Sequence, residues 1–484
     1  MKRVGLLALC GVALLTPLAG CGDDDDVVTA DAAVDGGAPL CAPAEVAAAL
    51  ASAAPGSTVQ LGTCRIMGAF TVPANVALLG AGVGKTVLIS PADGVALTLL
   101  PGTAPTRVAD LTIESAGRAA VVVKGTSAPG GAALVRVTVL MTKGVGVAAE
   151  RVPGLLLTDV TITGDLEAID APALPALPLP ADYPAYGVVA IDSEVTAQRL
   201  VVSRLAATGV VFSSSIVTWT GGQACDNAIA GVHADGGTLT LSDVIACRTL
   251  ESGPNPGFGM LFTGGVVVTS NAVKAMDNER FGVAHVGSNG THTDFVGMRN
   301  GDPAIWVEGS TSFTLKGAGS LLMGNKFNAL VVRDSSNATV RDAMISDTVM
   351  EQRTTHEATG TSNVIVTNGD GLQFLRATSS SIRDVRLINN ARTGLLFDVA
   401  SGANSDVQLL GTVTVSGPGN GALMQNVSGM VAPGVGGWDN AVVRDSATMT
   451  RDAAVTVRLG TVGVGVISPQ ILPSPLRALL GLRL

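Results

Sequence analysis

The sequence predicts an all-β solenoid, a coil of short strands in which each turn stacks on the one before. From about residue 57 onward, short runs of Val, Ile, Leu and Thr alternate with Gly, Asn, Asp and Ser, as strands alternate with turns. These runs recur about every 22 residues, and a fixed period of this size indicates a repeat architecture. The composition agrees, because 47% hydrophobic residues, 14% charged residues and 60 glycines suit one long, regular stack.

Two recurring phrases define the period. In the first, an Asp or Arg precedes alternating apolar residues, as at Asp110, Arg136, Asp159, Asp243, Asp342 and Asp384. In the second, a small residue opens a strand, as at Gly187, Gly209, Gly231, Gly259, Gly282, Ala304, Ala329, Gly371 and Gly394. Many gaps between these openings are 22 to 25 residues, and the gap of 42 from Ala329 to Gly371 is interpreted as close to two periods.

An asparagine stands four residues before several of these openings, at Asn227, Asn278, Asn300, Asn325 and Asn390. Asparagine tolerates left-handed backbone and bonds within its own turn, so residues stacked at one corner of successive coils can form a hydrogen-bonded ladder. This pattern resembles the right-handed, single-stranded parallel β-helix of the pectate-lyase-like superfamily. The resemblance covers roughly residues 58–465 and implies that fold, all-β, for this stretch.

The chain before the coils predicts a cap. Residues 43–54 are strong helix formers with a proline at the first turn, so we expect a short capping helix within residues 41–57. Such a helix would cover the open edge of the first coil. Of the six cysteines, Cys225 and Cys247 are one period apart and should be neighbours in adjacent coils, close enough for a disulfide. Cys41 and Cys64 would then join the cap to the first coil.

The first residues predict export. Met1-Lys2-Arg3 precedes an apolar stretch and then Leu18-Ala19-Gly20-Cys21, which is typical of a signal peptide. Because it ends on a cysteine, the segment resembles the lipobox of bacterial lipoproteins, which implies cleavage after residue 20 and a lipid on Cys21. The apolar core is too short to span a bilayer as a helix. We therefore expect a protein of the cell envelope that is bound to a membrane by lipid, with the outer membrane favoured because Gly22 is not aspartate.

These observations divide the chain into five parts. We expect a signal peptide at residues 1–20, a disordered acidic tether at 21–40, the capping helix at 41–57, the β-helix at 58–465 and an apolar C-terminal cap or tail at 466–484. Membrane contact is the alternative for the tail. The formal net charge of -9 and the lack of any basic patch argue against nucleic acid as a partner.

Three places break the period, and each follows the same strand phrase. They are residues 165–186, 250–258 and 349–362. Insertions at one phase of a solenoid leave from one corner, so they predict a shared binding face. The candidate binding residues in them are Tyr183, Tyr186, Glu351, Arg353 and His356. Functionless insertion is the alternative, because surface loops accept extra residues at little cost.

Catalytic signatures known in the resembled superfamily are mostly missing, so the catalytic residues are unknown and we expect no metal site and no cofactor. A loose cluster remains: Asp277, Glu279, Arg280, His285, His292 and Asp294, with His233 two coils away. It would supply a base and carboxylates for Ca²⁺ under a lyase mechanism. Because side chains alternate along a strand, not all of these residues can converge.

The sequence thus favours a non-enzymatic, lipid-anchored β-helix for surface adhesion or ligand binding, with a polysaccharide or another cell-surface ligand as its partner. The alternative is a surface-anchored polysaccharide lyase or glycoside hydrolase that acts on an acidic glycan. Only 3% of the residues are aromatic, which disfavours grooves that stack sugar rings.

Overall fold

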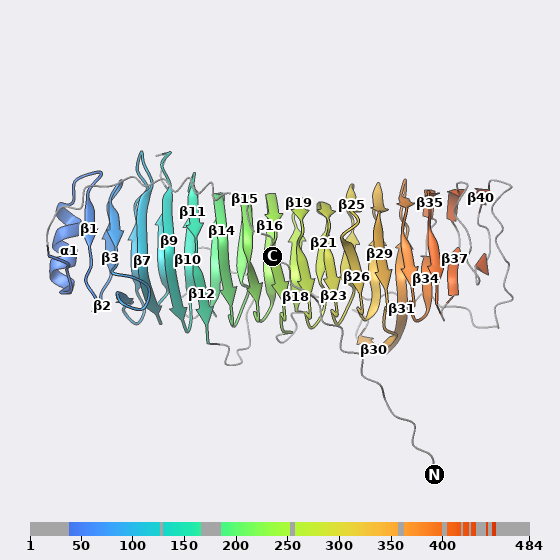
Figure 1. Cartoon of the computed structure of the whole chain (residues 1–484), viewed down its shortest axis with the longest axis horizontal. Coiled ribbons are helices and arrows are strands. Elements are labelled where there is room, and N and C mark those ends of the chain that lie inside the picture. The colour runs from blue at the N-terminus through green and yellow to red at the C-terminus, as the bar shows by residue number, and fades with distance from the viewer. Residues whose placement is uncertain are drawn as a thin grey trace, which may run out of the picture.

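The protein is an elongated parallel β-helix, as the sequence predicted. The computed structural model describes residues 38–125, 129–165, 185–251, 257–356, 363–398, 404–417, 420–424, 427–431, 442–443 and 448–451. The chain winds right-handedly through three stacks of parallel strands, which we call stacks A, B and C, and each coil passes through B, then C, then A. Figure 1 shows the coils following one another along the long axis from α1 to β40.

Each stack adds one short strand per coil. Stack A contains β3 (Phe70–Val72), β6 (Val95–Leu99), β8 (Ala119–Lys124), β10 (Val145–Glu150), β13 (Tyr186–Ile191), β18 (Phe258–Thr263), β21 (Val283–Val286), β24 (Ile305–Glu308), β27 (Phe327–Arg333), β31 (Asn363–Leu375), β34 (Thr393–Asp398), β37 (Asn420–Met424) and β39 (Val442–Val443). Stack B contains β1 (Thr58–Gln60), β4 (Ala77–Leu79), β11 (Leu155–Thr158), β19 (Val267–Asn271), β22 (Asn289–Thr293), β25 (Phe313–Lys316), β28 (Ala338–Arg341), β32 (Ser381–Arg383), β35 (Asn404–Leu410), β38 (Val427–Val431) and β40 (Thr448–Arg451).

Stack C and five longer strands complete the coil. Stack C contains β2 (Arg65–Met67), β5 (Val87–Ile89), β12 (Thr161–Gly164), β17 (Ile245–Cys247), β20 (Lys274–Met276), β23 (Val296–Met298), β26 (Ser320–Met323), β29 (Ala343–Ser346), β33 (Arg386–Ile388) and β36 (Thr414–Ser416). Some strands continue around a corner: β7 (Thr106–Ser115), β9 (Ala132–Met141) and β14 (Glu194–Ser203) run through B and C, β15 (Val210–Cys225) runs through all three stacks, and β16 (Ala230–Ser242) runs through A and B.

The core is the inside of the coil. Alternate residues of each strand point inward, so Leu239 and Leu241 are buried while Thr240 between them is half-buried and points outward. The inward side chains of successive coils form one apolar cluster that runs from Val46 to Ala422. This continuous burial is the main stabilising term, because each fully buried Val or Leu contributes about 1.5–3 kcal/mol.

The expected capping helix is present at the first coil. Helix α1 (Pro43–Ser52) begins with proline at its first turn, and its Val46 and Leu50 are buried in the core cluster. The helix contacts β1 and β3, so it covers the end of the first coil. A disulfide between Cys41 and Cys64 joins the cap to that coil with a Cα–Cα distance of 5.9 Å, as predicted.

The second predicted disulfide is present as well. Cys225 at the end of β15 pairs in register with Cys247 at the end of β17, and their Cα atoms are 4.5 Å apart. The spacing of one period therefore did place the two cysteines at the same position of adjacent coils.

The glycines that open strands of stack A are required by close backbone approach. A Cβ atom built on Gly209 would lie 2.5 Å from the carbonyl oxygen of Gly231, and one on Gly231 would lie 2.7 Å from that of Gly259. Real Cβ atoms do not approach an oxygen so closely, so larger residues would push the coils apart at this corner.

The asparagine ladder forms, but the left-handed backbone lies one residue earlier than expected. Asn278 donates to Asn300 at 2.8 Å, and Asn300 donates to Asn325 at 2.9 Å, with all three side chains buried. The residues with positive φ are those just before, such as Asp277 and Arg299. The asparagine side chain points inward to satisfy buried backbone groups, and its predecessor turns the corner.

The gap of 42 residues between Ala329 and Gly371 is one coil and not two. Strand β27 pairs directly with β31 in stack A, with Leu330 opposite Leu372. The additional residues form a hairpin in which β30 (Glu351–His356) pairs antiparallel with the first half of β31. The interpretation as two periods was wrong because an insertion nearly as long as a coil mimics the period.

Candidate functional site

The three insertions begin at one corner of the coil. The first lies between β12 and β13, the second between β17 and β18, and the third between β29 and β31. In each case the preceding strand belongs to stack C and the following strand to stack A. Residues 166–184, 252–256 and 357–362 lie outside the described residues. The outer faces of stacks C and A therefore both border all three insertions.

The first insertion ends earlier than the sequence suggested. Tyr186 is the first residue of β13 and is fully buried, in an apolar cluster with Val145, Val189 and Val211. It is a packing residue of stack A and not an exposed loop residue. Tyr183 and Cys21, the residue expected to carry a lipid, both lie outside the described residues.

The third insertion is a β-hairpin where a loop was expected. Glu351 opens β30, and its carboxylate lies 3.5 Å from the ammonium group of Lys326. Arg353 and His356 lie on the same strand, with His356 opposite Asn363, but their side chains lie outside the described part. The hairpin therefore places Glu351 beside Lys326 of the preceding coil. Its described side chains form no catalytic arrangement.

The suspected catalytic cluster does not converge. His285 and His292 point into the coil, where both are fully buried. Asp277 and Arg280 instead lie near the corner between stacks C and A, where each pairs with a residue of the next coil, Asp277 with Arg299 at 2.7 Å and Arg280 with Asp302 at 2.5 Å. The alternation of side chains along each strand separates these groups.

The other two members of that cluster occupy corner positions. Glu279 accepts a hydrogen bond from the backbone N–H of Glu251 at 2.6 Å. Asp294 has a positive φ and accepts a hydrogen bond from the backbone N–H of Gly319 at 2.9 Å. Neither carboxylate faces the histidines.

The two inward histidines form a structural pair. Their Nε2 atoms are 2.8 Å apart, so one ring donates a hydrogen bond and the other accepts it. Ser288 and Ser270 bond the remaining ring nitrogens of His285 and His292. Burial lowers the pKa of His292 to about 4 and that of His285 well below the ordinary value. The pair is neutral at pH 7 and completes a hydrogen-bonded chain inside the coil.

Stack A differs from the other stacks because its outer face is also apolar. One outward residue from each strand of stack A between β6 and β34 forms a row in which each residue is paired in register with the next. We call it the central row: Thr98, Val122, Ala148, Val189, Val211, His233, Leu261, Ala284, Trp306, Val331, Gln373 and Leu396. Nine of these twelve residues are apolar, and the exceptions are Thr98, His233 and Gln373.

The central row has a buried section from Val211 onward. Leu261 is 2% exposed and Trp306 is 1% exposed. Aromatic rings support this section from the strand starts, with Phe258 stacked on Phe281 at 5.2 Å and Phe281 edge-on to Trp306 at 5.9 Å. Such ring pairs add about 0.5–1.5 kcal/mol each beyond their buried area.

His233 is the one histidine among the described side chains that points outward. It is 4% exposed, and its Nε2 lies 3.3 Å from the hydroxyl of Thr263, which donates to Asp235 at 2.8 Å. Burial lowers the pKa of His233 to about 4, against the opposing effect of the Asp235 charge. At pH 7 the ring is neutral and already hydrogen-bonded, so this arrangement stabilises stack A.

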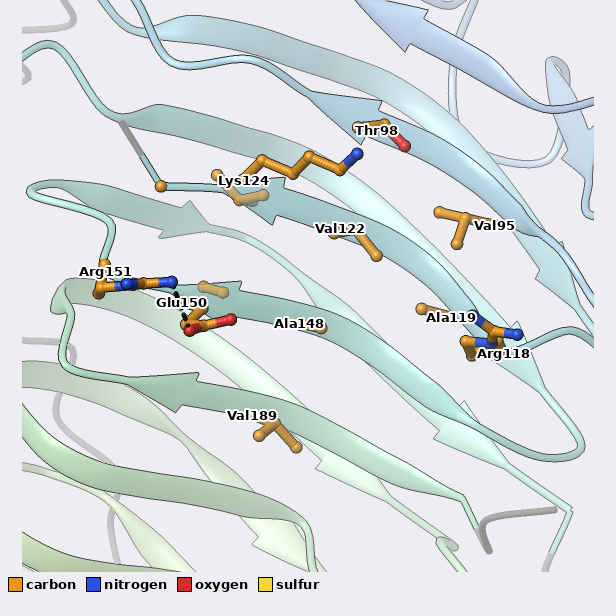
Figure 2. Close-up of a pocket in the computed structure, with 13 residues that line it drawn as sticks. Val95, Thr98, Arg118, Ala119, Val122, Lys124, Ala148, Glu150, Arg151 and Val189 are labelled. Atoms are coloured by element: carbon orange, nitrogen blue, oxygen red, sulfur yellow. Dashed lines mark hydrogen bonds and ion pairs between the residues drawn. The ribbon is translucent and has the colours of Figure 1, made fainter. Parts of the chain in front are cut away.

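The central row has an open section at its beginning, and this section forms a groove. The groove has a volume of about 690 Å³ and lies across β6, β8, β10 and β13. Its floor is aliphatic: Val95, Ala119, Val122, Ala148 and Val189. Figure 2 shows these side chains rising from successive strands, without an aromatic ring among them.

Charged side chains stand at both ends of the groove. Arg118 lies at the end where the strands begin, and Lys124, Glu150 and Arg151 lie where they finish (Figure 2). The carboxylate of Glu150 is paired with Arg151 at 2.8 Å. Three cations against one carboxylate give this groove a local positive charge in a chain whose formal net charge is -9. No insertion or motif marks these residues in the sequence, so the groove could not be predicted from it.

Two negative findings concern the described part of the chain. There, no three His, Cys, Asp or Glu side chains gather in a way that could hold a metal ion. No helix in these residues combines the length and the apolar character that a membrane span needs.

Comparisons with known proteins leave the site unassigned. No family model and no curated protein matches the chain. Among solved structures, the A-module of the mannuronan C-5 epimerase AlgE6 from Azotobacter vinelandii is similar at 16% identity and a TM-score of 0.23, over 89% of this chain and 99% of that one.

Two other solved structures are similar at the same level. A mutant of the periplasmic alginate epimerase AlgG has 12% identity and a TM-score of 0.30, over 69% of this chain and 78% of that one. Tailspike protein 3 of bacteriophage CBA120 has 12% identity and a TM-score of 0.30, over 89% and 57%. At such low identities and TM-scores, these likenesses say nothing about what this chain binds.

Proposed function

We propose that this protein is a lipid-anchored, non-enzymatic β-helix of the cell envelope that binds an anionic ligand with an aliphatic portion. The groove across β6, β8, β10 and β13 carries this proposal. Its floor offers apolar contact, and Arg118, Lys124 and Arg151 offer positive charge at both ends. A ligand that is apolar along its length and acidic at one end satisfies both features.

The aliphatic floor favours this ligand over a sugar chain. Sugar rings are bound by stacking on aromatic side chains, and the residues that line the groove include none. Arg118, Lys124 and Arg151 remain compatible with an acidic glycan, which is therefore the competing ligand in the test. The lyase alternative receives no support from His233, His285 and His292, because all three are neutral and engaged in structural hydrogen bonds.

Membrane attachment rests on the sequence Leu18-Ala19-Gly20-Cys21. We expect Cys21→Ser to release the protein from membranes into the soluble fraction. If the variant still partitions with membranes in a detergent-dependent way, the lipid anchor is refuted. The same variant supplies the soluble full-length chain for the binding experiments.

The binding test uses dodecanoate as the probe, with dodecyl maltoside as the uncharged control and acetate as the control for charge alone, in isothermal titration calorimetry. We expect dodecanoate to bind and both controls to bind more weakly. Lys124→Glu should weaken binding about three- to tenfold, the range for reversing a partly exposed charge. Lys274→Glu, an exposed lysine on stack C, is the matched control and should leave the affinity unchanged.

Two results would overturn the proposal. One is that the groove does not bind the probe: either the Lys124→Glu and Lys274→Glu proteins bind dodecanoate equally well, or neither the unchanged chain nor any variant binds it. The other is release of unsaturated uronates or reducing ends from polygalacturonate or alginate, with or without Ca²⁺. That second result would show an enzyme that acts on an acidic glycan.

A further inference from the structure

The outer face of stack B carries an uninterrupted row of threonines. Seven successive coils place a threonine at the same position, each paired in register with the next: Thr196, Thr218, Thr240, Thr269, Thr291, Thr314 and Thr339. Neighbouring strands lie about 4.8 Å apart, so this threonine row extends roughly 29 Å along the rod.

The threonine row points outward. In β15, Thr218 is exposed between the inward Val217 and Trp219, which are 1% and 0% exposed. In β19, Thr269 is exposed between the buried Val268 and Ser270. The remaining members are half-buried at their strands. The row is therefore a solvent-facing feature and not part of the core.

The rows on either side of the threonine row carry no charge over four successive coils. These flanking residues are Ile216, Thr238, Val267 and Asn289 on one side and Thr220, Ser242, Asn271 and Thr293 on the other. Together with Thr218, Thr240, Thr269 and Thr291 they make twelve outward positions, three in each of four coils, without one Asp, Glu, Lys or Arg. Ile216 and Val267 are 60% and 48% exposed.

This face is suited to an ordered lattice of water. Threonine is β-branched and stiff at χ1, so its methyl and hydroxyl groups are held in fixed directions. The methyl group orders first-shell water, and the hydroxyl donates and accepts hydrogen bonds. In-register parallel strands repeat both groups at a constant interval, which is close to the repeat of water molecules in ice.

From this juxtaposition we infer that the outer face of stack B binds ice, through the threonine row and its uncharged neighbours. The face has no aromatic ring for stacking on a crystalline polysaccharide, and no cation to hold an acidic one, over its four central coils. The inference does not depend on the groove, which lies on stack A in earlier coils.

The experiment measures the partition of the full-length Cys21→Ser protein into slowly grown ice, together with inhibition of ice recrystallisation. We expect the protein to enter the ice and to keep the crystals small. Thr269→Lys, in the middle of the threonine row, should remove both effects because a hydrated charge disrupts the lattice. Thr138→Lys is the matched control, since Thr138 is a half-buried threonine that points outward from stack C.

Thr269→Ser refines the test. It keeps the hydroxyl and removes the methyl, so we expect it to lose most of the partition into ice if methyl-ordered water is required. The inference is overturned if the unchanged protein is excluded from ice, if Thr269→Lys enters ice as well as Thr138→Lys does, or if the protein is retained by crystalline cellulose or chitin instead. A failure to bind dodecanoate does not change the partition into ice, the inhibition of recrystallisation or the retention by cellulose or chitin. Each proposal can therefore be refuted without the other.

Discussion

The outer faces of stacks A and B are built on the same backbone and carry opposite surfaces. Within one coil the chain passes from β18, whose outward Leu261 is 2% exposed, to β19, whose outward Val267 is 48% exposed. Strand β18 is apolar on both faces, whereas β19 alternates between apolar and polar residues. The comparison shows that the coil dictates only the inward positions, and that each outer face is free to take its own chemistry.

Charged pairs stand at the two corners on either side of stack C. Bidentate Arg–Asp pairs between adjacent coils, such as Arg248 with Asp226 and Arg299 with Asp277, stand where stack C turns into stack A. Arg199 pairs in the same way with Asp159 at the corner between B and C. All of these residues have positive φ, a conformation that costs a non-glycine residue roughly 1–2 kcal/mol. The charge-assisted pairing offsets part of that cost.

The largest effect should come from placing a charge on each face. Leu261→Asp buries an unpaired carboxylate, so we expect the free energy of unfolding to fall by about 3–5 kcal/mol. Val267→Asp in the same coil remains hydrated and should change it by less than about 0.5 kcal/mol. Urea unfolding followed by circular dichroism measures both. Equal effects of the two substitutions would show that the buried section of the central row is not a closed surface.

Acid should destabilise the protein through its buried histidines. The pKa of His233, His285 and His292 is lower in the folded chain than the ordinary value of an unfolded histidine. The unfolded chain therefore binds more protons below pH 6.5, and stability is complete above that pH and falls as the pH drops toward 4. For a group with a folded pKa of about 4, the loss from pH 7 to pH 5 is about 2 kcal/mol.

His233 allows the acid effect to be assigned to a face. His233→Gln removes the outward histidine of stack A and leaves the inward pair intact, so the unfolding free energy should depend less steeply on pH between 7 and 5. Stack B has no outward histidine in its described coils, and Thr240→Gln serves as the control. An unchanged pH dependence in the His233→Gln protein contradicts the neutral state assigned to this ring.

A smaller loss of stability should accompany Val122→Asp in the open section of the central row. Val122 is half-buried, so the cost should be about 1 kcal/mol, well below that at Leu261. Dodecanoate affinity should nevertheless fall about tenfold or more, because a carboxylate in the floor repels the anion and removes apolar contact. Calorimetry on a chain shown to be folded measures this. Unchanged affinity would place the ligand elsewhere.

The smallest effect is expected at a corner. Arg248→Ala removes the bidentate pair with Asp226, whose side chain is 35% exposed, so the loss should be about 0.5–1 kcal/mol and should shrink in high salt. Thermal unfolding at low and high salt measures it. A loss of several kcal/mol would show that the corner pairs, and not the apolar core, hold the coils in register.

Particular residues show how far the sequence could be interpreted. The spacing of Cys225 and Cys247 predicted correctly that they occupy the same position of adjacent coils, because their separation of 22 residues equals the period. Tyr186 was assigned to a loop, and it is buried, because a strand start and the end of an insertion have the same composition. The gap between Ala329 and Gly371 was misjudged for a different reason: an insertion nearly as long as a coil makes one coil look like two by length.

The sequence by itself determined the strands, their period, the cap and the positions of the insertions, since these follow from alternation and spacing along the chain. Only the tertiary structure decided which outward residues meet. Val95, Val122, Ala148 and Val189 form one groove floor, and seven threonines form one row, because the coil brings together residues that are 20 or more positions apart. Contacts of that kind depend on the register between strands, which no local pattern contains.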